Sequence, residues 1–355
     1  MEDHANCPAC GAGEQGLVIT FPDATTCLKI QRAIVADFAH CSRPLDEHRA
    51  WFELKYAYDC LPYWEEFYEV ESWGLTFANA SPTGIITPVA SLSWQELKST
   101  KPDLWIDDVI RFGRIRMMKQ PIVDVRHAKT IGFEMLARGL REDGSIISPG
   151  ELYAAARNQS QLFRLDRACR MAAIEASQAL RQDTLVFVNF VPTSIYVPEH
   201  CLATTIATVD KLSINRRRIV FEVVETDQVQ DTSHLDRILS YYRNTGFRCA
   251  LDDFGEGFND AGMLRALQPD IVKLDRKYVT QIDTDATKRE VARQIHREGT
   301  AIGATMLAEG VESEAEAKVL AALGYDWQQG YWYGRPDWDA MDVDDQQLRG
   351  VMHYS

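Results

Sequence analysis

The chain has 355 residues, of which 46% are hydrophobic and 25% charged, and its formal net charge is −14 at pH 7. This composition excludes a disordered or fibrous protein and suits one large domain with a smaller one. The acidic balance disfavours binding to duplex nucleic acid or to an anionic membrane. No apolar run approaches the roughly 18 residues of a membrane-spanning helix. The first residues, Met1 to His4, lack a secretory signal, so we expect a cytoplasmic protein.

Charge divides the chain near residue 110. Residues 1–110 hold 17 acidic and 7 basic side chains, whereas residues 111–355 hold 35 and 31. We therefore expect a smaller N-terminal domain over 1–110 and a larger one over 111–355. Within the first we expect a helix over 28–41, an aromatic-rich core segment over 51–68, and a linker helix around Ser93–Lys98 and Asp107–Arg116.

The N-terminal domain carries a cluster of cysteines. Cys7-Pro8-Ala9-Cys10-Gly11 has the spacing of a metal knuckle, but no second such pair follows. Cys27 and Cys41 are candidates for the remaining ligands of a zinc or other metal ion. Ordinary reduced cysteines are the first interpretation of this cluster. A bound metal ion and a redox-responsive thiol pair are the alternatives.

From about residue 111, short β-branched runs alternate with longer amphipathic segments. This alternation is typical of βα units and a parallel sheet. The segments with helical periodicity are 150–181, 233–245, 285–299 and 313–323. Ser233 and Ser313 are the expected N-caps of the two helices that begin at these residues.

Each apolar run ends at a polar side chain: Glu134, Asn189, Glu222, Asp252-Asp253, Lys273, Glu309 and Gln329. For any one of them a surface loop is the simpler interpretation. A closed (β/α) barrel, however, places the carboxyl ends of its strands on one face, where these side chains would meet. Clustered carboxylates repel and need cations to stay ionised, and hard oxygen ligands favour Mg²⁺ or Mn²⁺.

Asp252-Asp253 is the sharpest local signal. One carboxylate could bridge two ions while its neighbour holds the second, and a pair of ions about 3.5–4 Å apart promotes phosphodiester hydrolysis. Alone, an Asp-Asp pair before Phe254-Gly255 is more typical of a turn with an Asx cap.

Several separated motifs together resemble those of the EAL-domain phosphodiesterases, which hydrolyse cyclic di-GMP. The resemblance covers roughly residues 115–340. It rests on Gln120-Pro121-Ile122-Val123-Asp124, Glu134-Met135-Leu136-Ala137-Arg138, Val188-Asn189, Phe221-Glu222-Val223-Val224-Glu225-Thr226, Asp252-Asp253-Phe254-Gly255-Glu256-Gly257-Phe258, Lys273-Leu274-Asp275-Arg276, Ala308-Glu309-Gly310-Val311-Glu312 and Gln329-Gly330-Tyr331. It implies a modified TIM-type (β/α)8 barrel with one antiparallel strand.

The resemblance also implies a role for each matching residue. Two Mg²⁺ or Mn²⁺ ions would be held by Glu134, Asn189, Glu222, Asp252, Asp253 and Glu309. Lys273 would lie beside the attacking water, Gln329 would support the site, and Arg138, Gln120 and Pro121 would bind substrate. Glu225 would tether the loop after Asp253, which couples the site to a homodimer interface. That loop, from Phe258 to Gly262, departs from the family pattern.

The sequence thus predicts a cytoplasmic bacterial phosphodiesterase that converts cyclic di-GMP to linear pGpG and is regulated by residues 1–110. The alternative is a weak or inactive barrel that acts as a cyclic di-GMP receptor or binds a protein. A different phosphodiester substrate is a third interpretation. Because every expected metal ligand is present, hydrolysis is favoured.

Overall fold

A computed structural model describes residues 14–33, 41–81, 84–100, 105–158, 161–223, 232–254, 261–339, 342–343 and 345–352. The described residues form two compact units. One combines residues of 1–108 with 153–165, and the other combines residues of 109–152 with 166–355. Among the helices described, none is both long and apolar enough to span a membrane.

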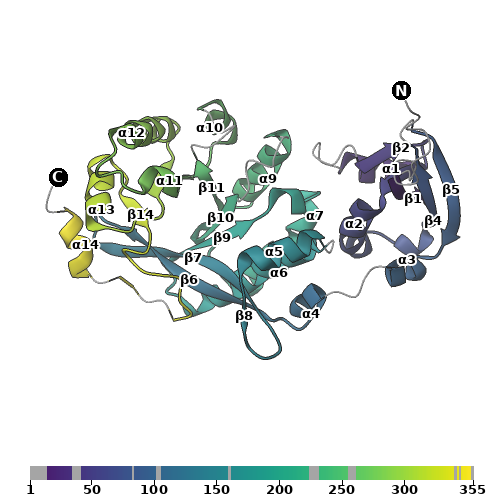
Figure 1. Cartoon of the computed structure of the whole chain (residues 1–355), viewed down its shortest axis with the longest axis horizontal. Coiled ribbons are helices and arrows are strands. Elements are labelled where there is room, and N and C mark those ends of the chain that lie inside the picture. Colours follow the sequence, from purple (N-terminus) through teal and green to yellow (C-terminus); the bar gives the residue numbers. More distant parts are fainter. Residues whose placement is uncertain are drawn as a thin grey trace, which may run out of the picture. The chain divides into compact units, whose positions relative to one another are not determined.

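The first unit is built on a five-stranded antiparallel sheet with the strand order β2-β3-β1-β4-β5 (Figure 1). Its elements are β1 (Glu14–Thr20), α1 (Ala24–Arg32), β2 (Ser42–Pro44), β3 (Arg49–Glu53), α2 (Leu54–Phe67), β4 (Gly74–Ala80), β5 (Ile86–Leu92), α3 (Trp94–Thr100) and α4 (Trp105–Arg111). This β-α-β-β-α-β order with a further strand is a split βαβ arrangement.

Aromatic side chains fill the core of the first unit. Phe52 of β3 lies edge-on to Trp64 of α2, with ring centroids 5.3 Å apart, and Phe21 packs on Trp73 at 4.9 Å. Trp51 and Phe52 of the strand and Tyr56, Tyr63 and Trp64 of the helix are buried, so the core interpretation of 51–68 is confirmed. Two expectations need correction. Helix α1 ends at Arg32, and the linker region forms two short helices, after which Ile115 already begins a strand.

The second unit is a closed ring of eight strands. In ring order these are β6 (Ile115–Asp124), β14 (Trp327–Gln329), β13 (Thr305–Ala308), β12 (Ile271–Leu274), β11 (Arg248–Phe254), β10 (Ile219–Val223), β9 (Leu185–Phe190) and β7 (Lys129–Leu140). Only β6 is antiparallel to both of its neighbours, and the two-residue strand β8 (Ile146–Ile147) pairs with β7 outside the ring. The predicted modified barrel with one antiparallel strand is confirmed.

Helices lie outside this ring (Figure 1): α5 (Pro149–Asn158), α6 (Leu162–Ala176), α7 (Pro198–Cys201), α8 (Ala203–Lys211), α9 (Thr232–Asn244), α10 (Ala261–Leu267), α11 (Arg276–Val279), α12 (Ala286–Ala301), α13 (Glu314–Ala322) and α14 (Asp345–Met352). Ser313 caps α13 in a reciprocal capping box with Glu316, as expected. Ser233 is not a cap, because α9 begins one residue earlier, at Thr232.

One layer of apolar side chains fills the barrel interior. It consists of Ile122, Phe187, Val220, Ala250, Ile271 and Leu307, each from a different strand and each essentially inaccessible to solvent. Such a layer makes the lower part of the barrel a packed core rather than a channel. Chemistry is therefore confined to the layer of side chains above it.

Candidate active site

The polar side chains predicted from the strand ends form the layer directly above this core. Strand side chains alternate between faces, so a residue two positions beyond an inward-facing one also faces inward. Val220 is followed in this way by Glu222, and Ile271 by Lys273. The same relation holds for Phe187 and Asn189, Ala250 and Asp252, Leu307 and Glu309, and Trp327 and Gln329.

Glu134 reaches this layer from within a strand rather than from a strand end. Strand β7 continues six residues beyond it, to Leu140, because β6 pairs with β7 along its length. The expectation that the run ends at Glu134 is therefore wrong. The register places Glu134 opposite Gln120 of β6, so both side chains lie on the same face of the sheet.

A β-bulge occurs at the two consecutive aspartates. In the pairing of β11 with β12, Leu251 lies opposite Val272 and Phe254 opposite Leu274, which leaves Asp252 and Asp253 opposite Lys273 alone. Regular pairing would direct neighbouring side chains to opposite faces, and a bulge re-aims them. The backbone thus departs from strand geometry at the predicted bridging position. The side chain of Asp253 lies outside the described set.

Lys273 is the centre of one polar cluster. Its ammonium Nζ lies 2.9 Å from Glu222 Oε1 and 3.1 Å from Asp252 Oδ1, and it also forms an ion pair with Glu309. Lys273 is 1% exposed and Glu222 is fully buried. Burial alone would lower the pKa of Lys273, but Asp252, Glu222 and Glu134 raise it well above its usual range. The side chain therefore stays cationic at neutral pH.

Glu134 is the centre of a second cluster, made of amides. Asn189 Nδ2 donates to Glu134 Oε1 at 2.9 Å, and Gln329 Nε2 donates to Glu134 Oε2 at 2.7 Å. Gln329 Nε2 also donates to Gln120 Oε1 at 3.3 Å. Both oxygens of the Glu134 carboxylate are thus held in place by side chains from β9 and β14.

Several buried oxygens in this layer have no hydrogen-bond donor among the described atoms: Asn189 Oδ1, Glu222 Oε2 and Gln329 Oε1. A buried acceptor without a partner is costly, and carbonyl and carboxylate oxygens are the ligands that Mg²⁺ and Mn²⁺ prefer. Although no group of three or more carboxylate, histidine or cysteine side chains in the described part is already arranged as a metal site, this donor set fits a divalent cation.

A cavity of about 190 Å³ opens next to Glu134. Its lining residues are Gln120, Glu134, Arg276, Glu309, Gly310, Glu312, Gln329, Gly330 and Tyr331. Of these, Arg276, Glu312 and the glycines follow strands β12, β13 and β14, and sequence reasoning assigned them no role. Arg276 Nη2 forms an ion pair with Glu312 at 2.6 Å, and no local pattern in the sequence distinguishes that pair from an ordinary surface contact.

The expected substrate residues lie on the two long strands. Arg138 follows Glu134 by four positions on β7, so it shares its face, and it is half-buried. Partial burial lowers the pKa of Arg138, while Glu134 and Tyr331 oppose that shift. Pro121 of β6 is buried and packs near Gly334, and it is not among the residues that line the cavity.

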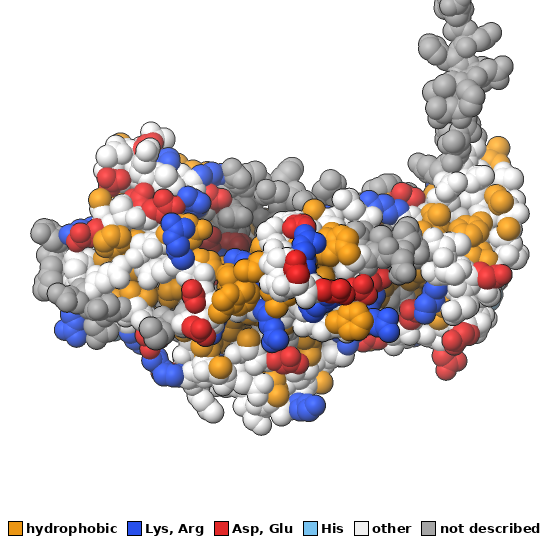
Figure 2. Space-filling model, turned by 60° about the horizontal axis from the view of Figure 1, so that its bottom comes forward, with side chains coloured by type: hydrophobic (Ala, Val, Ile, Leu, Met, Phe, Trp, Pro, Cys, Tyr) orange, Lys and Arg blue, Asp and Glu red, His pale blue; other side chains and the backbone are white. Residues whose placement is uncertain are grey.

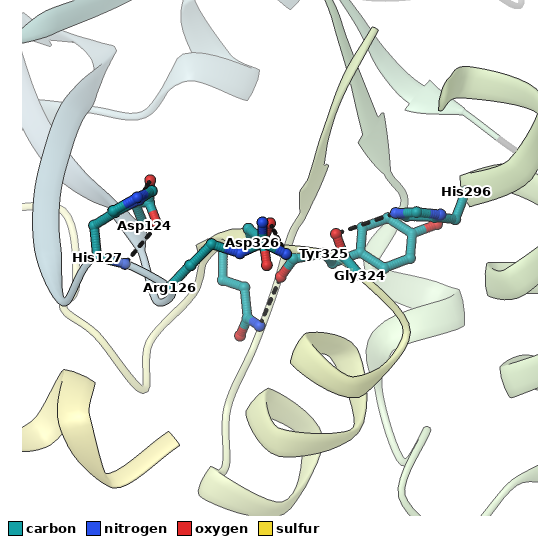
Figure 3. Close-up of polar contacts among 8 residues, drawn as sticks. Asp124, Arg126, His127, His296, Gly324, Tyr325 and Asp326 are labelled. Atoms are coloured by element: carbon teal, nitrogen blue, oxygen red, sulfur yellow. Dashed lines mark hydrogen bonds and ion pairs between the residues drawn. The ribbon is translucent and has the colours of Figure 1, made fainter. Parts of the chain in front are cut away.

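His127 lies at the other end of the barrel. The side chain is 63% exposed and its Nδ1 lies 2.8 Å from Asp124 Oδ2 (Figure 3). Asp124 pairs with Trp327, the first residue of β14, whereas the site is at the last residue, Gln329. In the same region Arg126 forms an ion pair with Asp326 at 3.0 Å. His127 is thus a surface residue remote from the polar layer.

The remaining candidates leave their roles untested. Cys7, Cys10, Glu225 and residues 258–260 of the loop after Asp253 lie outside the described residues, whereas Ala261 and Gly262 begin α10. Cys27 and Cys41 are buried thiols. Burial raises the pKa of Cys27, and Gln31 donates to its sulfur.

Fold and site together define a closed βα barrel whose mouth is lined by carboxylates, amides and one buried ammonium. The model of the EAL domain family matches residues 105–336. The chain therefore belongs to the EAL domain family, and the resemblance in its motifs is confirmed.

Known proteins with the same domain are similar over about two thirds of the chain. A standalone EAL protein from Vibrio cholerae O395, solved in its c-di-GMP-bound form, is 32% identical, with a TM-score of 0.59 over 66% of this chain and 97% of that one. Klebsiella pneumoniae BlrP1, in a manganese and cyclic di-GMP complex, is 25% identical, with a TM-score of 0.58 over 65% and 58%. The probable cyclic di-GMP phosphodiesterase PdeI of Escherichia coli K12 is 28% identical over 68% of this chain and 32% of its own length.

The chain spans 31 to 37% of the length of three of the curated relatives it matches. The activities of those longer proteins as wholes therefore do not carry over to this chain.

Proposed function

We propose that this chain is a metal-dependent phosphodiesterase that hydrolyses cyclic di-GMP to linear pGpG. The observation that carries the proposal is the single polar layer in which Glu134, Asn189, Glu222, Asp252 and Glu309 meet above the barrel core. Relatives with this domain were solved with cyclic di-GMP, in one case together with manganese. In this chain, buried oxygens that lack a hydrogen-bond donor likewise support a divalent cation as the cofactor.

In this proposal Glu134, Asn189, Glu222 and Asp252 hold one divalent ion, and Asp252, Asp253 and Glu309 hold a second. Bound Mg²⁺ or Mn²⁺ would supply a hydroxide near neutral pH and stabilise the leaving oxygen.

The protein's own side chains orient the reactants. Lys273 stays protonated, so it donates to the attacking water and cannot act as its base. Gln329 and Asn189 fix the Glu134 carboxylate. The planar guanidinium of Arg138 is suited to grip a phosphate in a forked contact.

The proposed partners follow from charge. On the face shown in Figure 2, basic side chains are interspersed with acidic ones rather than gathered into one surface. That pattern favours a small dinucleotide over duplex nucleic acid. We also propose a homodimer, in which Glu225 tethers the loop after Asp253, and a location in the bacterial cytoplasm.

The test is direct. Purified protein incubated with cyclic di-GMP and Mg²⁺ or Mn²⁺ is expected to produce pGpG, detected by chromatography. Glu134→Ala should lower turnover by at least about 100-fold, because even residues that only support metal ligands cost 10–100-fold. Glu142→Ala is the matched control, since its side chain is 84% exposed. Binding of cyclic di-GMP without pGpG formation by the unaltered protein would instead identify a receptor.

We further propose that the first unit regulates the barrel. A Cβ at Gly16 would overlap the indole of Trp51 and approach the carbonyl oxygen of Phe52 to 2.5 Å. Gly16→Ala should therefore destabilise this unit by about 1–3 kcal/mol. We expect a several-fold change in pGpG formation by the full chain. Gly150→Ala, where a Cβ has open space, is the control. Equal turnover by both variants and the unaltered protein contradicts regulation.

A further inference from the structure

The side chain of Gln120 links the polar layer to a segment that follows the last strand. That segment, residues 330–337, is here called the C-terminal strap. Gln120 Nε2 donates to the backbone carbonyl of Gly334 at 3.2 Å, and Gln120 Oε1 accepts from Gln329 Nε2 at 3.3 Å. Gln120 is 8% exposed, so both polar atoms of its amide are engaged by the protein.

The backbone of the strap is fixed against β6 and against the loop that follows β13. The amides and carbonyls of Lys119 and Asp337 exchange two hydrogen bonds, of 2.8 and 3.1 Å. Trp332 N donates to Val311 O at 2.9 Å, and Gly334 lies so close to Pro121 that a Cβ would come within 2.9 Å of its ring. Gly334 therefore presents its carbonyl to Gln120 from a well-supported position.

The hydrogen bonds from Gly334 through Gln120 and Gln329 to Glu134 are here called the relay. The strap determines which atom of each amide donates and which accepts. A carbonyl oxygen can only accept, so Gly334 requires Gln120 to present its NH₂ group. Gln120 must then offer its oxygen to Gln329, which in turn presents its own NH₂ to Gln120 and to Glu134. The carbonyl oxygen of Gln329, buried and without a donor among the described atoms, is left as the free acceptor of that amide.

We infer that Gln120 is a positioning residue that acts through Gln329 on Glu134, coupling the strap to the metal-binding carboxylate. The family resemblance implied a direct substrate contact for Gln120, and the relay is a different role for the same side chain. The inference rests on the proposed function, because it assigns Glu134 the role of a metal ligand. Loss of a substrate contact would raise KM, whereas loss of the relay would lower kcat.

The experiment is a double-mutant cycle with Gln120→Met and Gln329→Met in the full chain. Gln120→Met should lower kcat by about 10–100-fold and change KM by less than about three-fold. In the Gln329→Met background it should have little further effect, since residues in one network are not additive. Gln120→Asn, too short to reach both partners yet still polar, should reproduce the loss of kcat and guards against misfolding of the first variant.

Gln328→Met is the matched control. Gln328 is also a buried glutamine of β14 and also contacts the strap, because the hydroxyl of Tyr333 donates to Gln328 Oε1. Its Nε2 donates to Ala317 O and Tyr325 O and not to Glu134, so this variant perturbs the strap without breaking the relay. It should affect thermal stability at least as much as Gln120→Met, with kcat of the folded protein retained. A raised KM at unchanged kcat, or losses of kcat that multiply in the double variant, overturns the inference.

A second readout separates the inference from the proposed function. The rise in melting temperature on adding Mn²⁺ should be smaller in Gln120→Met than in the unaltered protein. The rise in Gln329→Met and the rise in the double variant should equal one another. If the unaltered protein binds Mn²⁺ but forms no pGpG, the proposed function fails while this comparison still tests the relay. An undiminished Mn²⁺ shift in Gln120→Met contradicts the relay.

Discussion

Lys273→Met is expected to destabilise the metal-free protein by about 3–5 kcal/mol, since removing one partner from a buried ion pair leaves uncompensated charge. Lys273 is the cation that contacts Glu222, Asp252 and Glu309, and its side chain is 1% exposed. Methionine has a similar length but no charge. The free energy of unfolding in the presence of EDTA, from urea denaturation, measures this loss.

The same variant should gain more stability from Mn²⁺ than the unaltered protein does, because a bound cation would replace part of the lost neutralisation. Lys318→Met is the control: Lys318 pairs with Glu314 one helical turn away, near the surface, and such pairs contribute about 0.5 kcal/mol or less. The pKa of Lys273 is raised, so its contribution is complete below the unfolded value of 10.5 and is lost only above it. A variant as stable as the parent in EDTA would contradict the assigned role.

Glu222→Gln is expected to have the opposite effect on the metal-free protein. Burial raises the pKa of Glu222 well above its usual 4.5, although Lys273 opposes this. A carboxyl whose pKa is raised in the folded state stabilises that state most when protonated, so stability falls as the pH rises above 4.5 towards the folded pKa. The glutamine carries no charge and does not titrate, and Asp252 and Glu309 still neutralise Lys273. The variant should therefore gain stability relative to the parent as the pH rises from 6 to 8.

This substitution should also remove most of the stabilisation by Mn²⁺ and abolish pGpG formation. Denaturation of both proteins at pH 6 and pH 8 in EDTA checks the first expectation: the parent should be less stable at pH 8 relative to the variant. If Glu222→Gln is less stable than the parent at both pH values, the buried carboxylate is neutralised by Lys273 to a greater degree than burial penalises it.

Much of the barrel site could be predicted from one local rule. In a strand whose carboxyl end lies at the barrel mouth, an inward-facing apolar residue is followed two positions later by a polar one, as with Val220 and Glu222. The rule works because period-two alternation and parallel strands give every strand the same phase. It misses Gln120, because β6 runs the other way and its polar residue precedes the apolar Ile122.

Other features have no local signature. Gln120 and Gln329 meet although 209 residues separate them, and the ion pair of Arg276 with Glu312 depends on how two loops are placed after closure of the ring. The bulge at Asp252 and Asp253 likewise appears only once the register with β12 is known. Composition and periodicity describe segments one at a time, whereas these contacts depend on several segments together.

The strap has a consequence for where the barrel ends. The family match stops at residue 336, but the backbone exchange with Lys119 involves Asp337, and Val343 N donates to Thr130 Oγ1 at 2.8 Å. A chain cut at the limit of the match would lose the pairing that supports Gly334 on the inner strand β6. The contacts that support the polar layer thus extend past residue 336, through Asp337 on β6 and Val343 on β7.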